Sequence, residues 1–150
     1  MLVARSGKGE EGFTLIELVL VLILVGILSA LGIGLLASQG AYSAGAARDQ
    51  LVSSANLAAK LALSRSGDGA SVRLTIEEDP SEWRFVVDPG HRVRTAQRHN
   101  ATLSRPVSTL DYRADGQLAS GDNLEFVFTG NSAHRACVLA SGFAYAGACP

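Results

Sequence analysis

One carboxylate, that of Glu17, stands at the start of a long uncharged stretch of this 150-residue chain. The thirty positions 18–47 carry no charged side chain, and positions 18–37 are predominantly apolar. Twenty residues of helix are about 30 Å long, which matches the hydrocarbon thickness of a bilayer. A carboxylate costs about 2.5–3.5 kcal/mol at mid-bilayer and less near the interface, and is usually retained for a partner. The pattern predicts a membrane-spanning helix with Glu17 at its edge.

Residue patterns that would support catalysis are missing from the sequence. The three histidines show no H-E-x-x-H spacing, and the chain has neither a G-x-S-x-G motif nor a phosphate-binding glycine loop. Cys137 and Cys149, with His134 nearby, lack a fourth ligand for zinc. Eleven residues separate the two cysteines, whereas redox pairs are closely spaced. We therefore expect no enzymatic activity, no cofactor and no metal site.

Residues 12–17, GFTLIE, follow a short leader that carries Arg5 and Lys8. Together with the apolar run, this segment resembles the processing site of type IV prepilins and type II secretion pseudopilins. The resemblance implies that a membrane peptidase cleaves between Gly12 and Phe13 and that Phe13 is then N-methylated. It also implies that Glu17 pairs with the terminal amine of a neighbouring subunit.

Two simpler interpretations of this N-terminal segment fit less well. A secretory signal peptide has a shorter apolar region with its small-residue cleavage site after that region. A plain membrane anchor explains the length of the run but gives no reason for Glu17 or for the preceding GFT. The prepilin interpretation accounts for all of these features.

The basic residues before the apolar run, Arg5 and Lys8, predict a cytoplasmic leader and a C-terminal domain in the periplasm or outside the cell. We divide the chain into a leader peptide (1–12), a transmembrane or filament-core helix (13–37), an amphipathic helix half (38–66) and a β-rich head (67–150). In an oxidising periplasm Cys137 and Cys149 have one possible pairing, so a disulfide is expected. Closing that loop would stabilise the fold by about 3 kcal/mol. Pilins often close a C-terminal loop in this way.

Periodicity predicts the elements that must position these groups. Glycines at 26, 32 and 34 weaken the apolar helix by about 1 kcal/mol each relative to alanine. After it, apolar residues recur at three- and four-residue spacing up to a terminator at 66–69. They are Leu51, Val52, Ala55, Ala58, Ala59, Ala62 and Leu63. The period then becomes two, with strands expected at 72–76, 83–87, 109–112, 124–128, 135–139 and 143–145, and a less regular stretch from 91 to 106.

These elements predict an α+β fold of the pilin type. A long N-terminal helix, with a membrane-spanning half and an amphipathic half, would pack on a C-terminal antiparallel β-sheet of four to six strands.

The head has balanced charge, with eleven Lys and Arg against eleven Asp and Glu from residue 48 onward. Bulk electrostatics therefore predicts no strong attraction to nucleic acid or to an acidic membrane. Locally, the head has an acidic cluster (Glu77, Glu78, Asp79, Glu82) and a basic cluster (Arg92, Arg94, Arg98, Arg105). The basic residues either pair with the acidic cluster, which spans the turn between two predicted strands and is called the acidic turn below, or with a neighbouring subunit. Alternatively, they contact DNA through Arg92, Arg94 and Arg98. They lack aromatic neighbours for base stacking.

Residues 47–60, together with a strand at 72–74, resemble the minor-pilin group that includes pseudopilin H of type II secretion and the FimT-like proteins. Residues 137–149 are most similar to the minor prepilin of mannose-sensitive haemagglutinin pili. The resemblance implies a minor type IV pilin that primes or caps assembly. Its partners would be other pilin subunits, the prepilin peptidase and methylase, and an inner-membrane assembly platform. A minor pseudopilin of type II secretion and a DNA-binding minor pilin are the alternatives.

Overall fold

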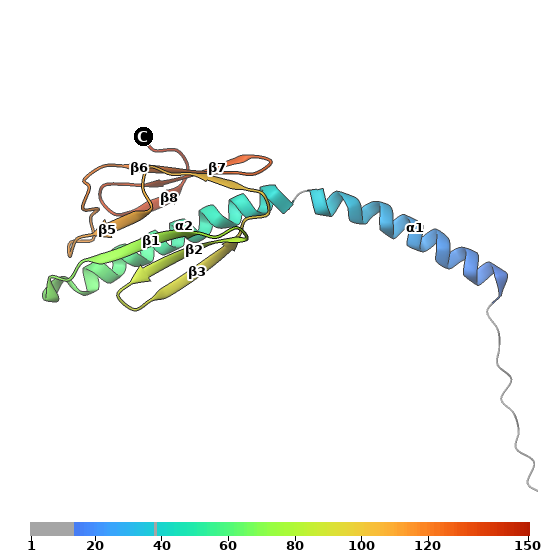
Figure 1. Cartoon of the computed structure of the whole chain (residues 1–150), viewed down its shortest axis with the longest axis horizontal. Helices are drawn as coiled ribbons and strands as arrows, with labels where there is room; N and C mark the ends of the chain where they lie inside the picture. The colour runs from blue at the N-terminus through green and yellow to red at the C-terminus, as the bar shows by residue number, and fades with distance from the viewer. Residues whose placement is uncertain (1–13, 38) are drawn as a thin grey trace, which may run out of the picture. The chain divides into compact units, whose positions relative to one another are not determined.

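The computed structural model of the chain describes residues 14–37 and 39–150, and the side chains of 14–29 and 42–150 (Figure 1). Two compact units divide between Ala37 and Ser38. The first contains one helix, α1 (Leu15–Ala37), and the second contains a helix and eight strands.

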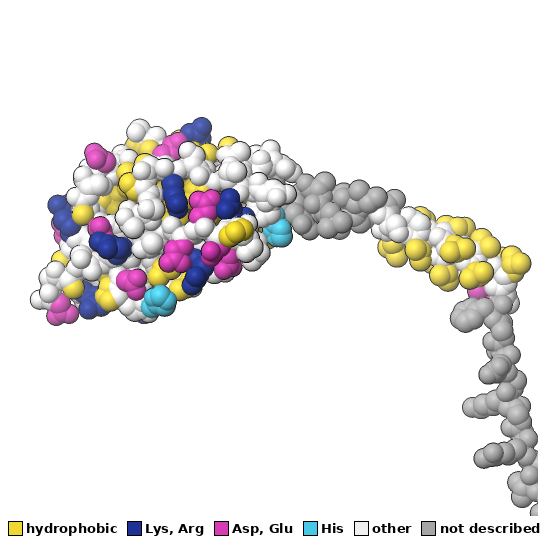
Figure 2. Space-filling view, viewed as in Figure 1, with side chains coloured by type: hydrophobic (Ala, Val, Ile, Leu, Met, Phe, Trp, Pro, Cys, Tyr) yellow, Lys and Arg dark blue, Asp and Glu magenta, His cyan; other side chains and the backbone are white. Residues whose placement is uncertain are grey.

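Between Leu15 and Leu28, helix α1 has apolar side chains around its circumference, with Glu17 as its single charged residue. Its Leu, Ile and Val side chains between Leu15 and Leu28 are all exposed, by 44% for Val19 up to 81% for Leu15. Figure 2 shows these hydrophobic side chains gathered along the helix, whereas both signs of charge are mixed over the head. The backbone is helical through Gly26, Gly32 and Gly34. Among the described residues, no helix is both long enough and apolar enough to cross a bilayer.

Helix α2 (Gln39–Ser64) carries the predicted amphipathic stripe. Six of its apolar side chains are fully buried, namely Ala44, Ala47, Leu51, Ala55, Ala58 and Ala62. Leu63 was expected in this stripe but is 53% exposed, because it lies at the rim of the helix face. The helix ends at Ser64 rather than at residue 66, and a short 3₁₀ turn (Ser66–Asp68) follows. Gly69 then adopts a left-handed conformation at φ 64°, as is common after a helix end.

The strands form two antiparallel sheets, so the prediction of a single sheet of four to six strands is wrong. The first sheet has the order β3-β2-β1-β5, and the second has the order β4-β6-β7-β8. The bounds of the first four in chain order are β1 (Val72–Glu78), β2 (Glu82–Asp88), β3 (Arg92–Gln97) and β4 (Thr102–Ser104). The others are β5 (Thr109–Tyr112), β6 (Leu124–Thr129), β7 (Ala133–Val138) and β8 (Ala144–Ala146).

Strands β3 and β4 lie in the stretch that was expected to be irregular. The alternation that identifies a strand is weak in β3, because Ala96 is its only buried residue and arginines occupy two positions on the same side. Strand β4 has just three residues, which is too short for a periodic signal.

The core of the head lies where α2 packs against both sheets (Figure 1). Trp83 of β2 meets Phe128 of β6 edge to face, with ring centroids 5.3 Å apart, so the two sheets also touch each other directly. Phe85 contacts the same ring at 6.5 Å. The small alanines of α2 let both sheets approach the helix backbone, while the largest fully buried side chains come from the strands, namely Trp83, Tyr112, Phe85, Phe126 and Phe128. The α+β class is thus as predicted, with the helix covered by sheets on two sides.

Candidate functional site

The first turn of α1 closes a hydrogen-bonded ring between Thr14 and Glu17. The Glu17 carboxylate oxygen Oε2 accepts bonds from the backbone N–H of Thr14 at 3.0 Å and from its hydroxyl at 2.9 Å. The backbone N–H of Glu17 in turn donates to the Thr14 hydroxyl at 3.4 Å. Thr14 is therefore the N-cap, and Glu17, three residues on, completes a capping box. The T-x-x-E spacing in the sequence is the signal from which this arrangement could have been predicted.

Glu17 has no counter-charge within its own helix. It is the single charged residue of positions 14–37, and the next charged residue along the chain is Arg48. Its neighbours Leu15, Ile16 and Leu18 are exposed apolar side chains. A cation that neutralises this carboxylate must therefore come from outside the helix. The predicted cleavage pair Gly12 and Phe13 lies outside the described residues.

The basic cluster is split between two environments. Arg98 and Arg105 both reach Glu78 of the acidic turn, with N–O distances of 3.1 and 3.6 Å. Arg98 also donates to the backbone oxygen of Asp79 at 3.0 Å and lies 5.4 Å from the centre of the Trp83 ring. The interpretation in which basic residues pair with the acidic turn is therefore confirmed for Arg98 and Arg105.

Arg92 and Arg94 lie apart from that network, on β3, where both are exposed. Within the described part of the chain neither forms an ion pair. Arg92, Arg94 and Arg98, proposed together as a nucleic-acid contact, therefore do not form one free basic surface, because Arg98 is committed to Glu78 and Trp83.

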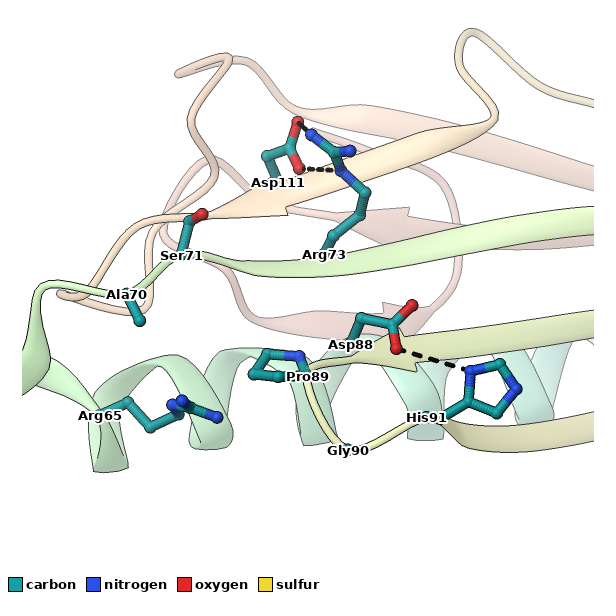
Figure 3. A pocket seen from close by; sticks show the side chains of 9 residues that line it. All are labelled: Arg65, Ala70, Ser71, Arg73, Asp88, Pro89, Gly90, His91 and Asp111. Carbon is teal, nitrogen blue, oxygen red and sulfur yellow. Dashed lines mark hydrogen bonds and ion pairs between the residues drawn. The ribbon is translucent and has the colours of Figure 1, made fainter.

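An open hollow of about 830 Å³ lies where α2 ends, beside the turn between β2 and β3 (Figure 3). Arg73 binds Asp111 through two N–O contacts of 2.6 and 3.4 Å. His91 lies 3.6 Å from Asp88. Ser71 supplies a hydroxyl to the lining of the hollow, but Figure 3 shows no bond between it and Asp111, Asp88 or His91. Among the described residues no group of three His, Cys, Asp or Glu side chains could hold a metal ion.

The C-terminal loop is closed by the predicted disulfide between Cys137 and Cys149, whose Cα atoms are 5.1 Å apart. Glu125 of β6 holds the same loop from the neighbouring strand. Its carboxylate accepts a bond from the backbone N–H of Cys149 at 2.9 Å and one from Arg135 at 2.5 Å. The Cys149 N–H, followed by Arg135, holds the pKa of Glu125 below its ordinary range.

This lowered pKa makes part of the stability of the head pH-dependent. A carboxylate with a depressed folded-state pKa stabilises the fold above its unfolded pKa, and this contribution is lost as pH falls through the folded value. We expect Glu125→Gln to be less stable than the parent chain near neutral pH, with the difference vanishing under acid. Urea unfolding midpoints measured across a pH series would show this. Arg135→Gln should reduce the pH dependence of stability less than Glu125→Gln does, because the Cys149 N–H lowers the pKa of Glu125 more than Arg135 does. A stability difference between Glu125→Gln and the parent chain that does not change with pH would contradict the assignment.

A second tie to the C-terminal region is a pair of hydrogen bonds between Asn56 of α2 and Ala144, called here the Asn56 clip. The side-chain amide of Asn56 donates to the backbone oxygen of Ala144 at 2.9 Å, and its side-chain oxygen accepts from the Ala144 N–H at 3.0 Å. Ala144 belongs to β8, the last strand of its sheet, so Asn56 satisfies backbone groups that a further strand would otherwise bind. Sequence reasoning missed this role, because a single asparagine on a polar helix face has no distinguishing pattern.

We expect Asn56→Ala to destabilise the head by about 2 kcal/mol, since two hydrogen bonds are lost and a partly buried backbone pair loses its partner. Asn56→Asp should cost more, because a carboxylate oxygen would then face the Ala144 carbonyl. Ser53→Ala, at an exposed position of the same helix, is the matched control and should stay within about 0.5 kcal/mol. Equilibrium unfolding in urea measures all three. Equal midpoints for Asn56→Ala and Ser53→Ala would show that the clip contributes nothing.

Comparison with known proteins gives a likeness in structure only. Neither the protein-family models nor the curated proteins compared include one that matches this sequence. The structure is similar to the type IV minor pilin FimU of Pseudomonas aeruginosa in two crystal forms. In one, the identity is 13%, with 67% of this chain and 92% of FimU covered, at a TM-score of 0.44. In the other, the identity is 15%, with 67% and 90% covered, at a TM-score of 0.42.

Proposed function

We propose that this chain is a non-enzymatic structural subunit of a type IV pilus, a minor pilin that primes or caps assembly. The observation that carries the proposal is the position of Glu17. It is the one charged residue in the first turn of a helix whose surrounding side chains are apolar and exposed. In this proposal cleavage after Gly12 leaves Phe13 as a methylated N-terminus, and the Phe13 amine of a neighbouring subunit neutralises Glu17.

The exposed apolar surface of α1 supports two successive environments for the helix. A helix that is hydrophobic all round is stable only when covered on all sides. Lipid of the inner membrane would cover it in the stored subunit, with the leader in the cytoplasm and the head in the periplasm. The stems of other subunits would cover it in the filament, so extraction exchanges one set of apolar contacts for another.

The head supports a structural role through its construction. The disulfide and Glu125 tie the second sheet to the C-terminal loop, and the Asn56 clip ties that sheet to α2. In the hollow at the end of α2, Arg73 is paired with Asp111. We expect such a head to stay folded in the periplasm, where ATP-dependent cytoplasmic chaperones do not act.

The mass of the mature protein tests the proposal directly. We expect protein purified from its native host to begin at Phe13 and to carry one added methyl group. Protein from a host without the prepilin peptidase should begin at Met1 and keep its leader. Gly12→Val is the matched variant, because it blocks cleavage without changing the helix. A mature chain that begins at Met1 beside an active peptidase would leave a tethered domain in place of a filament subunit.

A further inference from the structure

Strand β3 has an open edge on its sheet. It is the first strand in the order β3-β2-β1-β5, and among the described residues no further strand pairs with it (Figure 1). With six residues, Arg92–Gln97, it is long enough to pair with an added strand. Unpaired N–H and C=O groups along such an edge are a template for another chain.

The other three outer strands are covered or short. Strand β5 is followed by a bridge between Tyr112 and Leu118, and the Ala119 N–H donates to the backbone oxygen of Asp111 at 2.8 Å. Strand β8 is clipped by Asn56. Strand β4 has three residues. Strand β3 is therefore the longest edge that the described part of the head leaves open.

The hydrogen-bond register shows which backbone groups of β3 face outward. The Arg98 N–H donates to the Ser81 oxygen at 2.9 Å, just beyond the paired residues Gln97 and Glu82. Because bonded pairs alternate in an antiparallel ladder, the residues at 96, 94 and 92 bond to β2 as Arg98 does. The N–H and C=O groups of Val93, Thr95 and Gln97 then point to the open edge.

The side chains of β3 specify the kind of strand that fits there. Arg92 and Arg94 lie on one side of the strand, opposite Val87 and Phe85, and carry two charges without an ion pair among the described residues. Val93, on the other side, is 38% exposed. An incoming strand would bond to Val93 and Thr95, so Arg92 and Arg94 would occupy the non-hydrogen-bonded positions, where cross-strand side chains are closest. Acidic side chains alternating with β-branched ones match this surface.

Two copies of this edge repel each other. If Val93 of one copy paired with Val93 of another, Arg92 would stand opposite Arg94 at two places, and like charges directly across a ladder are destabilising. Charged side chains on an edge are a known protection against self-association. The same charges attract an acidic strand.

We infer that the open edge of β3 receives an extended acidic segment of another protein, which adds a fifth strand to this sheet. The segment bonds through its backbone to Val93 and Thr95, and its carboxylates meet Arg92 and Arg94. Recognition by strand addition combines backbone affinity with side-chain specificity in this way. The inference does not depend on filament assembly, because the surface belongs to the head alone.

The test is a titration of the full ¹⁵N-labelled chain in detergent micelles with a capped peptide of alternating glutamate and valine. We expect shifts of the Val93, Thr95 and Gln97 amide signals, with slowed hydrogen exchange at the same positions. A lysine–valine peptide should bind about tenfold more weakly, as two opposite-charge cross-strand pairs would give. A glutamate–valine peptide with N-methylated amides on its pairing edge should not bind.

Variants of β3 separate strand addition from simple charge attraction. Thr95→Pro removes an outward N–H and should abolish binding while the ladder to β2 remains, because proline is tolerated on the open side of an edge strand. Thr95→Val, the matched control, keeps the N–H and should bind as the parent does. Replacing both Arg92 and Arg94 by Glu should reverse the preference toward the lysine peptide. Undiminished binding to Thr95→Pro, equal affinity for the two peptides, or no shifts at millimolar peptide would each overturn the inference.

Discussion

Glu17→Gln is expected to leave the chain inserted and cleaved but to exclude it from filaments. Glutamine is the other residue that completes a capping box, so the ring with Thr14 survives while the charge is lost. In the assembled state the charged amine of Phe13 would then lie in an apolar environment without its partner. Breaking a buried ion pair in this way typically costs about 3–5 kcal/mol, which is a factor of a hundred or more in an assembly equilibrium. Sheared filament fractions and membrane fractions, probed for the tagged variant, provide the measurement.

Thr14→Val is the control that divides the two roles of Glu17. It removes the cap but keeps the carboxylate, so the helix start should weaken by about 1 kcal/mol while incorporation persists. If Glu17→Gln enters filaments normally and Thr14→Val does not, then Glu17 serves to cap its own helix. The proposed pairing of Glu17 with a neighbouring subunit would then be wrong.

Gly142→Ala should be the most destabilising single change in the head. A Cβ placed at Gly142 would lie 1.9 Å from the backbone oxygen of Gly116, and the residue has φ 86°, a left-handed conformation. The conformational strain costs about 1–2 kcal/mol and forced overpacking about 1–3 kcal/mol. The turn that follows β7 and the turn at Gly116 must separate to admit one methyl group. Since domains are stable by about 5–15 kcal/mol, we expect a large loss of thermal stability and of protein yield.

Gly121→Ala distinguishes the clash from the backbone strain. Gly121 also has a left-handed φ, 75°, but its Cβ would meet nothing within 4 Å. This variant should therefore cost only the strain of about 1–2 kcal/mol. Thermal unfolding of the two variants side by side checks the difference. Equal destabilisation would mean that the close approach of the two turns contributes nothing.

The elements with strong periodic signals were predictable from the sequence, and the contacts between distant segments were not. The helical stripe through Leu51 and Ala58, the hairpin that contains Trp83, and the Cys137–Cys149 bond were all predicted and are present. Each depends on local spacing or on the pairing of two cysteines. The division into two sheets was missed, because an alternating strand pattern shows which face is buried but not which strand is its neighbour.

The same limit applies to the candidate site. Glu17 was predictable because one charge stands against a long apolar run. Its hydrogen bonds to Thr14 could also have been predicted, because a capping box has a fixed sequence spacing. The clip between Asn56 and Ala144 joins residues 88 positions apart. Gly142 is constrained by the backbone of a different turn. In both cases the partner is distant in the sequence, so the residue type alone does not predict which segment it contacts in the folded chain.

The alanine-lined face of α2 restricts how this head can diverge. The side chains at 55, 58 and 62 are fully buried where both sheets meet the same helix, so one larger side chain would displace two layers at once. Outward strand positions such as 73 and 77 are exposed, and their surface ion pairs contribute little to stability, so their side chains can vary more widely. Distant sequences with this architecture should therefore differ most over their strands and least in the volumes along the helix. Comparing side-chain volumes along α2 should therefore identify such chains even where overall sequence identity is low.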